Sequence, residues 1–289
     1  MYDKVIIFSD YGLDDAVAAA YLLKTCKCKS IDIVAIAGNT TAENSLNNAV
    51  KLLHNSSKCE AKITLVDTTD EPQNYAHLPS IHGNDGMGDL FSDVEYPKDT
   101  IKFDKWLASI DPDSKPTIVS LGPATLVVPL IKKLNLFKDK NSNNSLENNI
   151  DTNIDNNINI KSKSNILMMG HNIDHEPNYM GEEFNFALDI ENFEWCLKNT
   201  DCVVATLDTC RASTFNLAGK HALSDDLFAK LLNKSIHLAT LRHSDNAYIY
   251  DYIAVRYLTT DEFEIVDKLD KRGNNVRMLN VKQEVDLLI

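Results

Sequence analysis

Short apolar runs alternate along the chain with longer helical patterns, and each run ends in polar residues. The first run, at residues 4–8, is rich in β-branched side chains, and a helical pattern follows at 16–23. Comparable runs occupy residues 31–37, 62–66, 117–121, 165–169 and 202–207. Because strands alternating with helices are typical of βαβ crossovers, the pattern predicts an α/β fold with a single open, mostly parallel, Rossmann-like sheet flanked by helices.

Polar turns follow several of these predicted strands. Ligands of open α/β sheets bind beyond the carboxyl ends of the strands, so we expect these turns to converge on one crevice. The turns are Asp10, Gly38-Asn39-Thr40-Thr41, Gly122-Pro123-Ala124-Thr125 and Gly170-His171-Asn172.

Three carboxylates gather where the first predicted strand gives way to its helix. Asp14 and Asp15 alone are explained by capping of a helix N-terminus, where acidic residues are common. With Asp10 added, the cluster repels itself unless a cation or a proton compensates. Oxygen ligands without nearby cysteine or histidine indicate a hard ion, Ca²⁺ or Mg²⁺.

Composition narrows the class of protein. A net charge of -13 argues against nucleic-acid polymers as partners, because phosphate backbones are bound by clustered Lys and Arg. No signal peptide and no stretch of membrane-spanning length is evident, so we expect a cytoplasmic protein without a membrane partner. The six cysteines lack paired CxxC spacing and are expected to be reduced, mostly structural thiols.

A low-complexity segment interrupts the pattern at about 138–164, where Asn, Ser, Asp and Lys predominate. Such sequence buries too little apolar surface to offset its ordering entropy, so we expect a disordered surface insertion. The strands predicted on either side supply residues to the same crevice. We therefore expect one catalytic domain over residues 1–289.

Several blocks together resemble the nucleoside hydrolase family, the inosine/uridine-preferring nucleoside N-ribohydrolases. The first block, at residues 10–16, has Phe8 before it where an aspartate is usual, and Tyr11 where proline is usual. Each block alone is weak evidence for the family, but the blocks occur together in the order and spacing of the family, and that combination is specific. The later blocks are Gly38-Asn39 with Asn47-Asn48-Ala49, 81–88, 121–125, 167–170, Glu183-Phe184-Asn185 and 250–255.

The resemblance implies the nucleoside hydrolase fold and a role for each site residue. It implies Ca²⁺ held by Asp10, Asp15, the main-chain carbonyl of Thr125, and Asp251. It also implies contacts to the ribose of a small-molecule ribonucleoside. The sugar contacts are Asp14, Asn39, Met169, Glu183 and Asn185, with Asn178 at the 5′ end although its spacing departs by one residue.

The activity that this resemblance implies is Ca²⁺-dependent hydrolysis of the N-glycosidic bond, in which Asp10 activates a metal-bound water. His82 and Tyr250 are the candidates that act on the leaving base. Tyrosine occupies position 250 where many members carry histidine, and it is a weaker acid than imidazolium, so purine or pyrimidine preference stays open. Other candidates in the same region are His237, His243, Tyr248 and Tyr252.

Two alternatives are weighed against this hydrolase. An aspartate phosphotransferase is disfavoured because Phe8 stands where its nucleophilic aspartate is needed. A catalytically impaired relative that binds ribose or nucleosides is favoured by Phe8, Tyr11 and Tyr250, but the retained carboxylates argue against it. The family further implies purine or pyrimidine salvage and a homo-oligomer, either a dimer or a tetramer.

Overall fold

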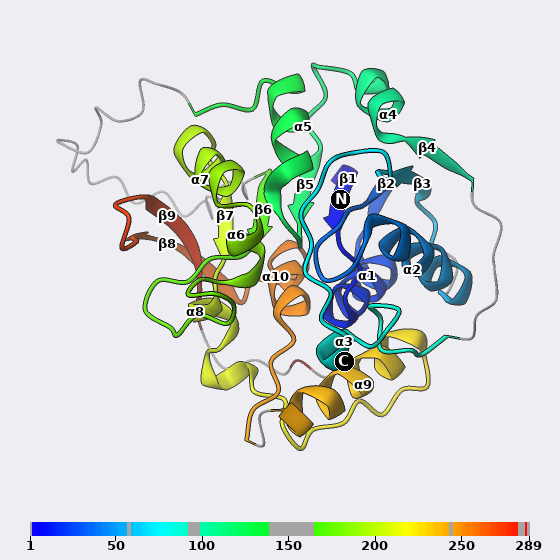
Figure 1. Ribbon diagram of the computed structural model, residues 1–289, viewed down its shortest axis with the longest axis vertical. Helices are drawn as coiled ribbons and strands as arrows, with labels where there is room; N and C mark the ends of the chain where they lie inside the picture. The colour runs from blue at the N-terminus through cyan, green and yellow to red at the C-terminus, as the bar shows by residue number, and fades with distance from the viewer. Residues whose placement is uncertain are drawn as a thin grey trace, which may run out of the picture.

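In the residues that the structure describes, a nine-stranded sheet forms the centre of the molecule (Figure 1). The computed structural model describes residues 2–56, 59–91, 99–138, 165–242, 245–282 and 287. The strand order is β4-β3-β2-β1-β5-β6-β7-β9-β8. The strands are β1 (Tyr2–Ser9), β2 (Cys28–Ala35), β3 (Lys62–Asp67), β4 (Thr100–Lys102), β5 (Thr117–Ser120), β6 (Ile166–Met169), β7 (Val203–Ala205), β8 (Phe263–Leu269) and β9 (Asn275–Val281).

Neighbouring strands run parallel throughout, except that β8 and β9 form an antiparallel hairpin at one edge. This confirms the predicted open, mostly parallel sheet. Strands β5 and β6 pair directly, with Ile118 opposite Ile166, although the predicted insertion separates them in the chain. All of that insertion except residue 138 lies outside the described residues.

Helices cover both faces of the sheet, and the alternation of side chains along β1 explains how. Val5 and Ile7 face a core shared with α1, α2, α9 and α10, whereas Ile6 and Phe8 face the core beneath α4, α5 and α7. Figure 1 shows the second group of helices along the upper side of the molecule. The helices are α1 (Leu13–Thr25), α2 (Ala42–Asn55), α3 (Pro79–His82), α4 (Phe103–Ser109), α5 (Val127–Lys133), α6 (Phe184–Leu188), α7 (Ile190–Asn199), α8 (Leu207–Cys210), α9 (Leu227–Arg242) and α10 (Tyr250–Thr259), with 3-10 turns η1 (Ala124–Leu126) and η3 (Ser213–Phe215).

Helix α10 is buried along most of its length, and this fixes the place of its first turn. The ring of Tyr252 packs on Tyr21 of α1 and on Phe228 of α9, with ring centroids 5.1 Å and 5.3 Å apart. Arg256, one turn further on, is buried and pairs with Glu262. Because α10 is held between α1 and α9, its N-terminal residues Tyr250 and Asp251 are presented at the carboxyl edge of the sheet.

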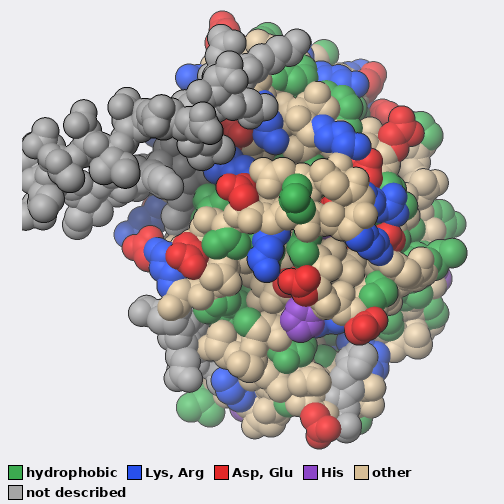
Figure 2. Space-filling model, turned by 90° about the vertical axis from the view of Figure 1, so that its left-hand side faces the viewer, with side chains coloured by type: hydrophobic (Ala, Val, Ile, Leu, Met, Phe, Trp, Pro, Cys, Tyr) green, Lys and Arg blue, Asp and Glu red, His purple; other side chains and the backbone are tan. Residues whose placement is uncertain are grey.

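The surface carries both signs of charge. On the face shown in Figure 2, acidic and basic side chains of the described residues are interspersed. Among the described helices, none combines the length and the hydrophobicity needed to cross a bilayer.

Candidate functional site

A cavity of about 580 Å³ opens beyond the carboxyl ends of the central strands. Nine of the residues that the sequence predicted for the site line this cavity, although they come from segments far apart in the chain. They are Asp14, Asn39, His82, Met169, Asn178, Glu183, Asn185, Tyr250 and Asp251. Asp10 and Asp15 are fully buried and reach the cavity through their contacts with the lining residues and with Gly12.

Three carboxylates converge at the N-termini of α1 and α10. Asp14, Asp15 and Asp251 each place one carboxylate oxygen within 4.8 Å of the others. Among the described residues, one buried oxygen of Asp14 and one of Asp251 has no hydrogen-bond partner. Burial, followed by the charge of neighbouring carboxylates, raises the pKa of Asp15 and of Asp251 well above the ordinary value. The cluster therefore lacks a compensating charge from its own side chains.

Asp15 also has the capping role that its place in α1 suggests. Its carboxylate accepts hydrogen bonds from the Ser9 hydroxyl at 2.7 Å and from the Gly12 amide at 3.1 Å. Asp15 therefore both caps α1 and belongs to the carboxylate cluster.

Asp10 is held by the turn after β2. The backbone amide of Asn39 donates to one carboxylate oxygen at 2.6 Å, and the Asn39 side-chain amide donates to the other at 3.0 Å. Burial raises the pKa of Asp10 above its ordinary value, while the hydrogen bond from the Asn39 backbone amide opposes the shift. Gly38 permits the approach, because a Cβ there would lie 1.9 Å from the Asp10 carboxylate. Gly12 is similarly constrained, by Asn39 and His82.

Thr125 lies in η1 and is not among the residues that line the cavity. Its hydroxyl donates to Asp189, the residue that caps α7. The ligand role predicted for its carbonyl stays a prediction, as does that of Asp10. Of the four predicted ligands, Asp15 and Asp251 are the two that belong to the convergent carboxylate cluster.

The loop between β6 and α6 supplies the opposite wall. Glu183 caps α6: its carboxylate accepts from the amides of Phe186 at 3.0 Å and His171 at 2.9 Å. Burial raises its pKa to about 7 against the effect of these bonds. The Asn185 amide donates to the carbonyls of Leu121 and Met169, at 3.0 and 3.3 Å. Asn178 accepts from the Phe184 amide at 2.9 Å.

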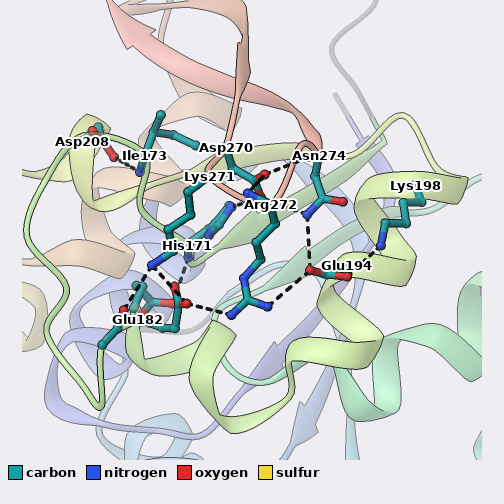
Figure 3. Close-up of polar contacts among 12 residues, drawn as sticks. His171, Ile173, Glu182, Glu194, Lys198, Asp208, Asp270, Lys271, Arg272 and Asn274 are labelled. Carbon is teal, nitrogen blue, oxygen red and sulfur yellow. Dashed lines mark hydrogen bonds and ion pairs between the residues drawn. The ribbon is translucent and has the colours of Figure 1, made fainter.

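A polar network supports this wall from behind (Figure 3). The buried imidazole of His171 stacks on Phe186 with ring centroids 4.3 Å apart, and its Nε2 lies 2.9 Å from Asp270. Arg272, in the turn between β8 and β9, donates to Glu182 at 2.8 Å. The C-terminal hairpin is thereby tied to His171, whose amide donates to Glu183, and to Glu182, which precedes Glu183 in the chain.

His82 and Tyr250 both line the cavity, and neither side chain carries the positive charge of a strong acid. The Leu13 amide donates to Nδ1 of His82 at 3.3 Å, so the neutral ring carries its proton on Nε2. Burial lowers the pKa of His82 and raises that of Tyr250. Both side chains are therefore neutral hydrogen-bond donors near pH 7.

Among the other leaving-group candidates, only Tyr248 is found at the cavity in the described part of the chain. His237 is exposed on α9, and the Tyr252 hydroxyl donates into the core, to the Leu287 carbonyl at 2.5 Å. His243 lies outside the described residues.

Comparison with known proteins agrees with this geometry. The model of the family described as "Inosine-uridine preferring nucleoside hydrolase" matches residues 5–146. Probable uridine nucleosidase 1 of Oryza sativa subsp. japonica is 29% identical over 147 residues, which are 48% of this chain and 44% of that protein. The non-specific ribonucleoside hydrolase RihC of Escherichia coli (strain SMS-3-5 / SECEC) is 29% identical over 135 residues, which are 45% of this chain and 43% of that protein. The chain thus spans less than half the length of these relatives.

Residues 5–146 of the chain therefore resemble the nucleoside hydrolase family. Solved structures with the same fold include a plant nucleoside hydrolase, the PpNRh1 enzyme, with a TM-score of 0.68 at 19% identity over 97% of this chain and 87% of that one. The purine-preferring ribonucleoside hydrolase from Gardnerella vaginalis has a TM-score of 0.64 at 18% identity, over 97% of this chain and 94% of that one.

The chain departs at two positions from the N-terminal block of the family that it resembles, and packing accounts for both. The Phe8 ring lies 6.3 Å from Trp106 in an edge-to-face contact on the far side of the sheet. Tyr11 is fully buried in the other core. Neither residue lines the cavity.

Sequence reasoning missed two arginines and a serine that line this cavity. Arg211 follows α8, whereas Ser235 and Arg242 belong to α9. A signal existed for Arg211, since the run at 202–207 predicts a strand whose following turn should reach the crevice like the others. No pattern marked Ser235 or Arg242, because their contribution depends on how α9 packs across α1.

Proposed function

We propose that the protein hydrolyses the N-glycosidic bond of ribonucleosides to give ribose and a free base. The observation that carries the proposal is the convergence of nine predicted site residues on one cavity whose floor is a carboxylate cluster. Two of the curated relatives are named as a probable uridine nucleosidase and a non-specific ribonucleoside hydrolase, which agrees with this activity.

Asp10 accepts the proton of the attacking water in this proposal. It is buried directly behind Asn39 and held by two hydrogen bonds, so its carboxylate is fixed in orientation. As the C1′–O bond forms and the C1′–N bond breaks, positive charge develops on the ribosyl group. The neighbouring carboxylates Asp14 and Asp251 stabilise that charge.

We further propose that the carboxylate cluster holds Ca²⁺. The residues fit such an ion: three carboxylates offer oxygens within 4.8 Å, and two of those side chains have buried oxygens without a hydrogen-bond partner in the described structure. Asp15 and Asp251 are assigned as ligands, with Asp14 or Asp10 beside them. A bound Ca²⁺ supplies charge neutralisation and an acidified, oriented water. Salvage, cytoplasmic location and assembly as a dimer or tetramer stay predictions.

One observation favours a second candidate, a nucleoside-binding protein with impaired catalysis. His82 and Tyr250 are both neutral near pH 7, so neither offers the cationic acid that a basic leaving group needs. Reducing-sugar release from inosine, uridine and cytidine, with Ca²⁺ or with chelator, distinguishes the two candidates. Ca²⁺-dependent release supports the hydrolase; binding without release contradicts it and supports the binding protein.

A further inference from the structure

Arg211 lines the cavity on the side of Tyr250 and is held there by two contacts. Its Nη1 donates to the Glu176 carbonyl at 2.8 Å, and its Nε donates to the Tyr250 hydroxyl at 3.3 Å. The guanidinium carbon lies 5.8 Å from the centre of the Tyr250 ring. A guanidinium has five N–H donors in a fixed planar fork, so these two bonds orient the group and leave donors for a ligand.

The charge of Arg211 has no ion-pair partner among the described residues. In the described chain, no carboxylate lies within ion-pair distance of Arg211, although the sequence holds 42 acidic residues against 29 basic ones. Arg242 lines the same cavity, where it donates to the Ile81 carbonyl at 3.3 Å. The lining of the cavity thus combines carboxylates with two arginines.

This polarity matches the charges that N-glycosidic cleavage creates. The electron pair of the C1′–N bond leaves with the base, so the sugar becomes cationic while the base becomes anionic unless it is protonated. A fixed cation that donates hydrogen bonds stabilises such a developing anion, as oxyanion-hole donors do. An arginine keeps its proton throughout, so it stabilises charge without acting as an acid.

We propose that Arg211 is a catalytic residue that binds the departing base as an anion, through hydrogen bonds to a carbonyl oxygen of the base. Tyr250 is then a positioning residue for the guanidinium. The water that forms the C1′–O bond loses its proton to Asp10, and the released base takes up a proton from solvent. The substrate class is ribosides whose base has a carbonyl oxygen conjugated with the leaving nitrogen.

The proposal rests on the proposed hydrolase function, and leaving-group dependence tests it separately. The probes are uridine, 5-fluorouridine, whose base is the better leaving group, and 4-nitrophenyl β-D-ribofuranoside, whose leaving group needs little stabilisation. We expect Arg211→Gln to lower kcat/KM for uridine by about 10²–10³-fold, the effect of removing one oxyanion donor. We expect a smaller loss for 5-fluorouridine and a change below about 5-fold for the nitrophenyl riboside.

Arg211→Lys keeps the charge but lacks the planar set of donors, so its kcat/KM for uridine is expected to lie between those of the wild type and Arg211→Gln. Arg277→Gln removes a half-buried cation of β9 that pairs with Asp201 outside the cavity; it is the charge control and should leave all three rates unchanged. Equal loss on all three substrates, or no loss on any, overturns the role of Arg211. A wild-type protein that cleaves none of them overturns the hydrolase function itself.

Discussion

The imidazole of His171 and the carboxylate of Asp270 meet at 2.9 Å with both side chains fully buried, although 99 residues separate them in the chain. The His171 amide donates to Glu183, and Asp270 begins the turn of the β8–β9 hairpin. This contact therefore connects an edge hairpin to the wall of the cavity.

We predict that Asp270→Asn destabilises the fold by about 1–3 kcal/mol, the cost of weakening a buried charged hydrogen bond. Burial alone would raise the pKa of Asp270, but hydrogen bonds from Asn274, His171 and Arg272 outweigh it and hold the pKa below the ordinary value. A depressed folded pKa stabilises the fold above the unfolded value, about 3.9, and that contribution is lost as pH falls through the folded pKa.

The difference in free energy of unfolding between the wild type and Asp270→Asn is thus expected to be largest near neutral pH and to shrink below about pH 4. Urea unfolding across this range measures it. Asp267→Asn, an exposed position on the same hairpin, is the control and should show neither effect. A pH-independent difference would contradict the assignment to the Asp270 carboxylate.

We predict that Asp10→Asn lowers kcat/KM for ribonucleosides by about 10³-fold or more while the fold persists. The neutral side chain cannot accept the proton of the attacking water, but it retains one acceptor oxygen for Asn39. Steady-state kinetics and thermal unfolding should be measured together, with the exposed Asp104→Asn as control. Near-wild-type turnover would exclude Asp10 as the general base.

We predict that Ca²⁺ raises the melting temperature and that a chelator reverses the effect. The ion relieves repulsion among Asp14, Asp15 and Asp251, and a ligand at a hundredfold excess over its Kd stabilises a protein by about 2.7 kcal/mol. Asp251→Asn should abolish the shift while leaving a folded protein. An equal Ca²⁺-induced shift in Asp251→Asn would place the ion elsewhere.

We predict that Gly38→Ala is far more damaging than Gly122→Ala. A Cβ at position 38 would lie 1.9 Å from the buried Asp10 carboxylate, which two hydrogen bonds hold in place. At position 122 the nearest atom, at 2.9 Å, is the flexible end of Ile36, which can move. Turnover and melting temperature of the two variants provide the comparison. Comparable effects would contradict the packing argument.

The sequence predicted those parts of the structure that local patterns determine. Continuous apolar runs identify the buried parallel strands, and the acidic residues after β1 indicate the floor of the site. Asp251 became interpretable only through the family resemblance, since locally it reads as the start of a helix. The short edge strand β4 and the β8–β9 hairpin were not predicted, because edge strands are defined by the partners that they meet across the sheet. Arg211 was missed although the run at 202–207 predicts a strand whose following turn reaches the crevice.

The position of Asp251 at the floor has a consequence for the timing of folding. The carboxylates at positions 14 and 15 are made early in synthesis, and their partner is added more than two hundred residues later. A nascent chain that has emerged only as far as β5 therefore carries the like charges without the helix that completes the cluster. Contacts of such sequence separation form slowly, so the cavity is expected to be among the last parts of the molecule to take shape on the ribosome.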